Sequence, residues 1–191
     1  MALASGGRMS KEIYQIKVAL VGIKPPIWRR LLVPANLTLA DLHEVLQVAM
    51  GWQNYHLHEF CIGNQSFMPP DPDLGSAAMV DRTPRLKAVL GKVGAKAEYT
   101  YDFGDGWLHT ITVEKILLRD PKRNYPVCVG GKRRCPPEDC GGVYGYYDFL
   151  DAIMDRSHPR HREMLDWIGD GYDPNDFSIA ATNIGLSEMR L

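Results

Sequence analysis

The stretch that most constrains this fold is residues 99–116, YTYDFGDGWLHTITVEKI, which predicts two strands joined by a tight turn. Aromatic and β-branched side chains recur there at every second position, a pattern typical of half-buried strands. They are Tyr99, Tyr101 and Phe103 before the turn, and Trp107, Ile111 and Val113 after it. Asp105-Gly106 accepts the positive φ angles that hairpin turns need. The chain is therefore expected to be organised around an antiparallel hairpin.

The same hairpin carries a candidate polar pocket. The alternation places His109 on the apolar face, while Asp102 and Asp105 lie next to the turn. An imidazole that is oriented by a carboxylate can act as a base or a metal ligand, and a core histidine with one hydrogen bond is the alternative. Upstream, His56-x-His58 on a strand could present two imidazoles to one metal ion. We therefore predict a candidate pocket of His58, Asp102, Asp105 and His109, with no catalytic role assigned.

The remaining pattern predicts an α+β fold, in which helices cover an antiparallel or mixed sheet built on hairpins. Thr38 and Asp41 form a capping box at the start of a helix, and Gly51 supplies its end. The segment 119–142 is expected to be a wrapped loop, and 176–186 a strand or an irregular tail. The sheet segments are predicted at about 13–33, 56–63 and 97–118, and the helices at about 39–50, 84–90, 145–155 and 159–168.

Length and charge limit the organisation and the class of protein. A chain of 191 residues suits one domain, which we place at 12–191 after a disordered tail or expression remnant at 1–11. The net charge of −1 argues against a strongly basic nucleic-acid binder. No apolar run reaches the length that crosses a bilayer, and the N-terminus has no apolar signal region. A cytoplasmic protein with reduced thiols and no membrane partner is expected.

Three of the four cysteines lie in the loop 119–142, at Cys128, Cys135 and Cys140. Their spacing, C-x6-C-x4-C, is not the paired C-x-x-C of a zinc ribbon. Two interpretations stay open. In the first, these cysteines and one histidine bind a structural zinc ion that stabilises the loop. In the second, the thiols pack as small apolar groups.

Basic residues in two places could contact an acidic partner. Lys132, Arg133 and Arg134 make the cysteine loop locally basic, so it is a candidate contact for a protein or for nucleic acid. Arg29 and Arg30 point to opposite faces of a predicted strand. Surface exposure or ion pairing is their simpler role, and phosphate contact is the alternative.

Several motifs together resemble a known family. They are YTYDFGDGWLHTITVE, CPPEDCGG with the following GYYDFL, GYDPNDFSI, and the N-terminal YQIKVAL, PPIWRRLLVP, TLADLHEVLQVAMGW and HLHEF. They are similar to the plasmid pRiA4b ORF-3-like family, also labelled as a TnpR-like passenger protein of insertion elements, over roughly residues 12–180. The resemblance implies an α+β fold and no established biochemical role.

Three functions are therefore compared. The one we favour is a non-catalytic binding or regulatory module associated with plasmids or mobile elements, whose partner is a protein, nucleic acid or a second copy in a homodimer. The first alternative is a metal-dependent or acid–base enzyme, similar to a hydrolase or nuclease, that uses the His/Asp pocket. The second is an interaction protein with structural zinc. Whether the protein is an enzyme stays open, since no P-loop, H-E-x-x-H or G-x-S-x-G motif is present.

Overall fold

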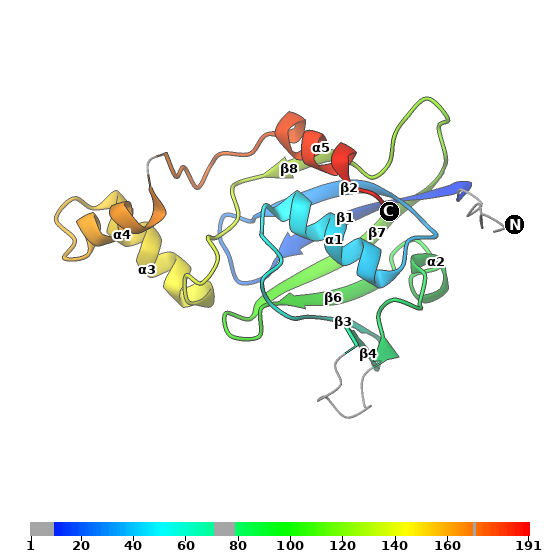
Figure 1. Cartoon of the computed structure of the whole chain (residues 1–191), viewed down its shortest axis with the longest axis horizontal. Coiled ribbons are helices and arrows are strands. Elements are labelled where there is room, and N and C mark those ends of the chain that lie inside the picture. Colours follow the sequence, from blue (N-terminus) through cyan, green and yellow to red (C-terminus); the bar gives the residue numbers. More distant parts are fainter. Residues whose placement is uncertain (1–9, 71–78, 170) are drawn as a thin grey trace, which may run out of the picture.

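The computed structural model describes residues 10–70, 79–169 and 171–191 (Figure 1). In chain order the elements are β1 (Glu12–Leu20), β2 (Trp28–Pro34), α1 (Leu39–Met50), β3 (His58–Ile62), β4 (Gln65–Met68), β5 (Met79–Val80), α2 (Leu86–Val89), β6 (Lys96–Tyr101), β7 (Trp107–Leu118), β8 (Val127–Lys132), α3 (Gly142–Met154), α4 (His161–Ile168) and α5 (Ile179–Glu188). The predicted tail at 1–11 falls mostly on residues outside these ranges. None of the described helices is both long enough and apolar enough to span a bilayer.

The strands form one mixed sheet in the order β5-β4-β3-β6-β7-β1-β2-β8. Neighbouring strands are antiparallel, except for the short parallel pair β4 and β5. The predicted central hairpin is confirmed, because β6 and β7 pair with Tyr99 opposite His109 and Tyr101 opposite Trp107. The α+β class that the sequence predicts is confirmed with it.

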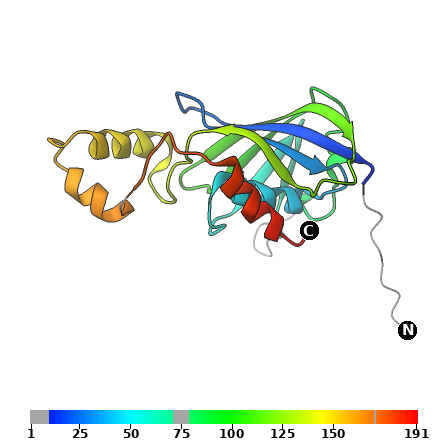
Figure 2. The same cartoon turned by 90° about the horizontal axis from the view of Figure 1, so that it is seen from above.

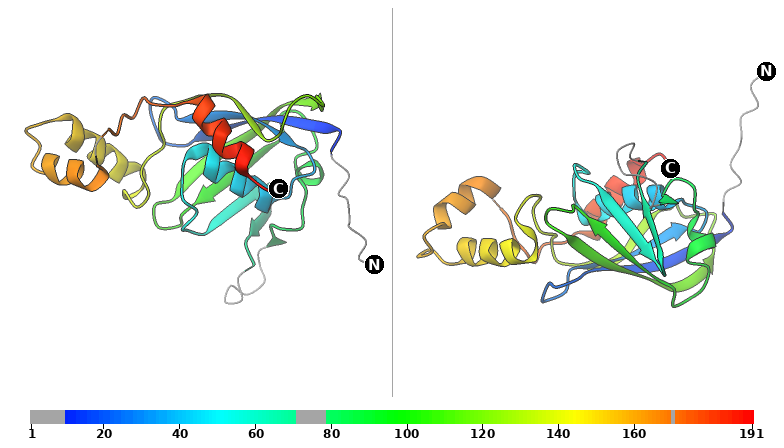
Figure 3. Two further views of the ribbon diagram at one scale, coloured as in Figure 1. Left: turned by 45° about the horizontal axis from the view of Figure 1, so that its top comes forward. Right: turned by 90° about the horizontal axis from the view of Figure 1, so that it is seen from below.

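Two helices cover one face of the curved sheet. Figures 2 and 3 show α1 and α5 on the same side of the sheet, which curls around them. The apolar stripe of α1 is buried there, and its predicted capping box is present, with Thr38 Oγ1 accepting from Asp41 N. Gly51 ends α1 in the left-handed conformation that C-terminal caps favour. The core therefore lies between the inward strand positions and α1.

Helices α3 and α4 form an arm that projects from one end of the sheet (Figure 1). The chain enters this arm from β8 through residues 133–141 and returns along the segment before α5 (Figures 1 and 2). The arm is joined to the β6–β7 turn, because Asp105 Oδ2 accepts a hydrogen bond from Gly141 N at 3.1 Å. This junction holds the β6–β7 turn against the segment that leads into α3.

Two segments differ from the sequence-based expectation. The cysteine loop contains a strand, β8, which pairs with β2 and so forms one edge of the sheet. Gly130 and Gly131 lower its strand propensity, but they let Trp28 and Phe177 pack closely against its backbone. The segment expected to be a strand or irregular is helix α5, which Ser178 caps through Ala181 N.

Candidate functional site

The two histidines of the predicted pocket share no hydrogen bond, although both rings lie near Tyr99. His58 Nε2 lies 2.9 Å from Asp81 Oδ2, and the His58 ring stacks on His43 at 3.5 Å between centroids. His109 Nδ1 donates to the Tyr99 carbonyl at 3.2 Å, and complete burial lowers the pKa of His109 to about 4. In the described part of the chain, neither histidine has a hydrogen bond to Asp102 or Asp105.

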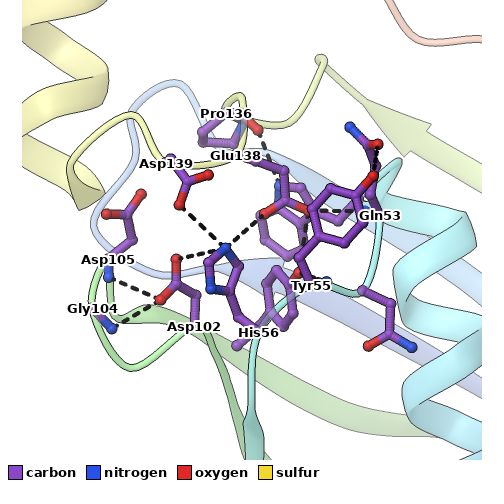
Figure 4. Close-up of polar contacts among 12 residues, drawn as sticks. Gln53, Tyr55, His56, Asp102, Gly104, Asp105, Pro136, Glu138 and Asp139 are labelled. Atoms are coloured by element: carbon purple, nitrogen blue, oxygen red, sulfur yellow. Dashed lines mark hydrogen bonds and ion pairs between the residues drawn. The ribbon is translucent and has the colours of Figure 1, made fainter.

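Asp102 instead belongs to a different group of polar side chains, which we call the His56 cluster: His56, Asp102, Glu138 and Asp139 (Figure 4). His56 Nε2 lies 3.2 Å from Asp139 Oδ1 and 3.7 Å from Asp102 Oδ2. The third oxygen, Glu138 Oε2, is 4.0 Å away. One imidazole nitrogen thus faces three carboxylates from two distant parts of the sequence.

The atoms at the centre of the cluster are buried without a hydrogen-bond partner. His56 Nε2 and Glu138 Oε2 are both shielded from solvent, and no acceptor or donor meets them in hydrogen-bond geometry. Buried polar atoms are normally paired, because leaving one unpaired costs about 1–3 kcal/mol. Asp102 is also buried, with 7 % of its side chain exposed, whereas the Asp139 side chain is 70 % exposed. The cluster is therefore closed on one side and open to solvent at Asp139.

The β6–β7 turn positions Asp102. Its Oδ1 atom accepts hydrogen bonds from Gly104 N at 2.9 Å and Asp105 N at 3.4 Å, so that Oδ2 is left to face His56. Asp102 has a φ of 57°, in the left-handed region that non-glycine residues rarely occupy. A strained backbone held by its surroundings is typical of functional positions.

Glu138 is fixed in the same way, through one oxygen only. Glu138 Oε1 accepts from Gln53 N at 2.8 Å and from the Tyr101 hydroxyl at 3.1 Å. Burial raises the pKa of Tyr101 to about 12, so this hydroxyl stays a donor at neutral pH. Both Glu138 and Asp102 therefore present one anchored oxygen to the protein and one unanchored oxygen to the cluster.

A network based on α1 positions the loop that carries His56. Asn54, with a φ of 58°, donates from its backbone nitrogen to Gln47 Oε1 at 3.0 Å. The Asn54 Oδ1 atom accepts from His43 Nε2 at 2.7 Å, so His43 Nδ1 is the acceptor for the Tyr99 hydroxyl. Burial lowers the pKa of His43 to about 4, consistent with a neutral ring. His56, two residues after Asn54, is thereby tied to a rigid helix.

Three members of the His56 cluster, His56, Asp102 and Asp139, are close enough together to hold one metal ion. Two ligand atoms bound at about 2.1 Å and about 90–110° apart lie about 3.0–3.4 Å from each other, and trans ligands about 4.2 Å. The distance from His56 Nε2 to Asp139 Oδ1, 3.2 Å, matches adjacent ligands, and the distance to Asp102 Oδ2, 3.7 Å, lies between the adjacent and trans values. The ligand atoms of His56, Asp102 and Asp139 all lie within 4.8 Å of one another, a group that does not include Glu138. Imidazole with carboxylates suits Zn²⁺ or Mn²⁺ better than Mg²⁺ or Cu⁺.

The three predicted cysteine ligands do not form such a group among the described residues. Cys128 Sγ contacts the Gly130 carbonyl at 3.3 Å, while Cys135 is buried beside Met50. Cys140 lies next to Asp139, and burial raises the pKa of its thiol to about 12. The thiols are free of disulfides and pack as separate groups.

The predicted basic contacts lie on the approach to the arm. Arg133 Nη1 donates to Asn175 Oδ1 at 2.6 Å, and Arg134 N donates to the Pro174 carbonyl. The Arg134 guanidinium lies over the Tyr172 ring, 4.8 Å from its centroid. Lys132, the last residue of β8, is exposed and accepts from Arg29 Nη1 through its carbonyl. Arg133 and Arg134 thus hold the segment that returns from the arm.

Sequence reasoning found part of this site. Asp102 is predicted from its place beside the turn. The H-x-H pattern predicts His56 and His58 on one strand around one metal ion, but His56 lies before β3 and His58 pairs with Asp81, so only His56 reaches this cluster. Glu138 and Asp139 follow two prolines in an irregular segment, where no periodicity assigns a face to a side chain. The combination of an acidic pair with flanking Pro-Pro and Gly-Gly in CPPEDCGG was the available signal.

Comparisons with known proteins identify relatives over most of the chain. A family model described as plasmid pRiA4b ORF-3-like protein matches residues 12–181. An uncharacterized protein, y4hQ, from Sinorhizobium fredii is 39% identical over 176 residues, which cover 92% of this chain and 88% of that protein. The crystal structure of a protein of unknown function, MM3350, from Methanosarcina mazei Go1 is similar with a TM-score of 0.82 and 37% identity, covering 90% of this chain and 97% of that one.

Proposed function

The chain belongs to the plasmid pRiA4b ORF-3-like family, and we propose that it is a binding module whose functional centre is a divalent cation held by the His56 cluster. The observation that carries this proposal is the buried His56 Nε2, which faces three carboxylates and has no hydrogen bond. A cation would pair with that nitrogen and offset the repulsion between the carboxylates.

The unanchored oxygens support the same proposal. Each of Asp102 and Glu138 uses one oxygen for hydrogen bonds to the protein and leaves the other toward His56. Hydrogen bonds of this kind orient metal-binding carboxylates, and they stay in place when the metal ion is removed. We therefore expect a site that needs little rearrangement to take up Zn²⁺ or Mn²⁺.

Isothermal titration of chelator-treated protein with Mn²⁺ or Zn²⁺ tests the proposal. We expect binding of about one equivalent. Asp139→Asn should weaken the affinity by more than about tenfold, because it removes an exposed ligand and leaves the fold intact. Asp151→Asn is the matched control, since Asp151 is an exposed carboxylate on α3 and should leave affinity unchanged. Equal affinities in both variants would refute the cation site.

A metal-dependent hydrolase is the second candidate, and the exposure of Asp139 favours it. A metal site with one solvent-open side can admit a substrate, whereas a purely structural site is closed. Mn²⁺-dependent release of p-nitrophenol from p-nitrophenyl phosphate, lost in Asp139→Asn, would favour the enzyme. Bound Mn²⁺ without turnover would favour the non-catalytic binding module.

A further inference from the structure

A groove lies at the end of the sheet remote from the arm, between the loop 119–126 that joins β7 to β8 and the C-terminal half of α5 (Figure 1). Its volume is about 610 Å³, within the range of sites that hold organic ligands. The residues of the His56 cluster do not line it. The groove is therefore a second place, separate from the proposed cation site, at which the protein could receive a ligand.

Hydrogen bonds hold both walls of this groove in place. On one side, the Asn183 side chain of α5 accepts from Cys128 N at 2.7 Å and donates to the Cys128 carbonyl at 3.0 Å, which joins the helix to the edge strand β8. On the other side, Asp120 Oδ1 accepts from Lys122 N at 2.9 Å, and the Tyr125 hydroxyl accepts from Asp120 N at 3.3 Å. The carboxylate of Asp120 thus shapes the loop, and the groove is formed before any ligand binds.

Three basic side chains line the groove: Arg119, Lys122 and Arg123. In the part of the chain that the structure describes, none of the three forms an ion pair. The surrounding sequence is basic as well, because residues 115–134 contain seven of the 22 Lys and Arg residues and one acidic residue, Asp120. The charge of this nearly neutral chain is therefore unevenly distributed, with a positive region at this loop.

The carboxylates outside the described ranges belong to other parts of the chain. Lys11, whose carbonyl accepts from Arg119 N at 2.9 Å, is preceded by a segment without Asp or Glu. The acidic residues that the structure does not describe are Asp71, Asp73 and Asp170. The first two are joined to β4, on the opposite side of the sheet from β8, and the third is joined to α4 in the arm. An anionic ligand is therefore the expected partner of the three basic side chains.

Tyr125 adds an aromatic ring to the groove. The Arg119 guanidinium lies over this ring, 4.9 Å from its centroid, and both side chains line the groove. The bases of a single-stranded nucleic acid stack on aromatic rings and guanidinium planes, while cationic side chains follow its phosphates. Duplex DNA offers the same phosphates but keeps its bases stacked on one another, so it would leave the ring unused. The combination favours a single strand over a duplex.

From these features we propose that the groove binds single-stranded nucleic acid without base specificity. Lys122 and Arg123 would contact phosphates, while Arg119 and Tyr125 would stack against a base. DNA and RNA share this chemistry. Because three basic side chains can meet about three phosphates, the affinity should be in the micromolar range and should depend strongly on salt.

Fluorescence anisotropy of a labelled thymidylate dodecamer, titrated with the full chain, tests this proposal. We expect the logarithm of the binding constant to fall with the logarithm of the salt concentration at a slope of about −2, since each phosphate contact on a single strand contributes about −0.7. The double variant Lys122→Gln, Arg123→Gln should have a slope of about −0.7 and at least about tenfold weaker binding at about 50 mM salt. The matched control is Lys92→Gln, Lys96→Gln, which changes the net charge equally at two exposed lysines outside the groove and should bind like the unaltered protein.

Tyr125→Leu tests the contribution of the ring separately. This variant should bind the dodecamer about tenfold more weakly, with an unchanged salt slope, because it loses a stacking surface and no phosphate contact. A uridylate dodecamer distinguishes RNA from DNA as the source of the strand, and binding of either one supports the proposal.

Three results would overturn the proposal. The first is the absence of binding to both oligonucleotides at about 50 mM salt. The second is an equal loss of affinity in the Lys92→Gln, Lys96→Gln control, which would mean that binding responds to net charge alone. The third is equally tight binding of an oligoglutamate peptide of the same length, unaffected by Tyr125→Leu, which would assign the groove to an acidic protein segment. The cation site would stand after any of these results, because the residues of the His56 cluster do not line the groove.

Discussion

Arg29 and Arg30 show how burial decides the role of a single residue. The Arg29 side chain is buried, and its Nε donates to the Ala49 carbonyl at the end of α1, where a positive charge complements the helix dipole. Arg30, on the other face, forms a two-point ion pair with Glu114 at 2.6 and 2.9 Å. The opposite placement of the two side chains follows from strand periodicity. Their hydrogen-bonding partners, which the periodicity does not predict, are groups of the protein itself.

The two neutral histidines His43 and His109 predict a pH dependence of stability. In each ring, burial lowers the pKa to about 4, from an unfolded value of about 6.5. Between these values the unfolded chain binds protons that the folded chain does not. The stability that each neutral histidine contributes is therefore fully present above pH 6.5 and is lost as the pH falls toward 4. At pH 5 the free energy of unfolding is lower by about 2 kcal/mol per histidine.

Urea unfolding of His109→Phe at pH 7 and pH 5 measures this effect. The variant keeps an aromatic ring beside Trp52 but has no titrating group at position 109. We expect the unaltered protein to lose about 2 kcal/mol more than the variant over this interval. An identical loss in both proteins would mean that His109 is not neutralised by burial.

At the scale of elements, the start of α3 is where the arm meets the central hairpin. Gly142 has a φ of 67°, and a Cβ atom there would overlap the carbonyl oxygen of Asp105. Asp139, three residues earlier, belongs to the His56 cluster. The close approach that Gly142 permits therefore holds the end of segment 138–142 against the turn that carries Asp102.

Gly142→Ala should weaken this junction. We expect a loss of about 1–3 kcal/mol beyond that of Gly169→Ala, because the added methyl group pushes on backbone atoms. Gly169 is a matched control: its φ is 75°, and a Cβ there would meet nothing within 4 Å. Urea unfolding measures the stability of each variant, and titration then measures its affinity for Mn²⁺. The Mn²⁺ affinity should fall in Gly142→Ala and stay unchanged in Gly169→Ala. Equal effects of the two substitutions would show that the contact with Asp105 is unimportant.

The elements that sequence reasoning predicted well are those with local signals. The alternation at 99–113 and the capping box at Thr38 each depend on residues a few positions apart. Strand β8 has no such signal, because Gly130 and Gly131 are poor strand residues that only its pairing with β2 explains. Similarly, Glu138 and Asp139 reach His56 through tertiary contacts, which no periodicity in their own segment could predict.

At the scale of the whole molecule, the His56 cluster joins two parts of the chain. His56 comes just before β3 and Asp102 just after β6, two neighbouring strands inside the sheet, and Glu138 and Asp139 come from the segment that leads into the arm. A bound cation would therefore link the arm to the sheet. This position explains why the cluster needs the complete fold, since neither part contains all three candidate ligands, His56, Asp102 and Asp139.

The most direct test is the anomalous scattering of Mn²⁺ in crystals of the protein grown or soaked with that ion. We predict one strong peak about 2.1–2.4 Å from His56 Nε2 and from carboxylate oxygens of Asp102 and Asp139. The absence of a peak at that position under saturating Mn²⁺, or a peak only elsewhere on the molecule, would contradict the cation site.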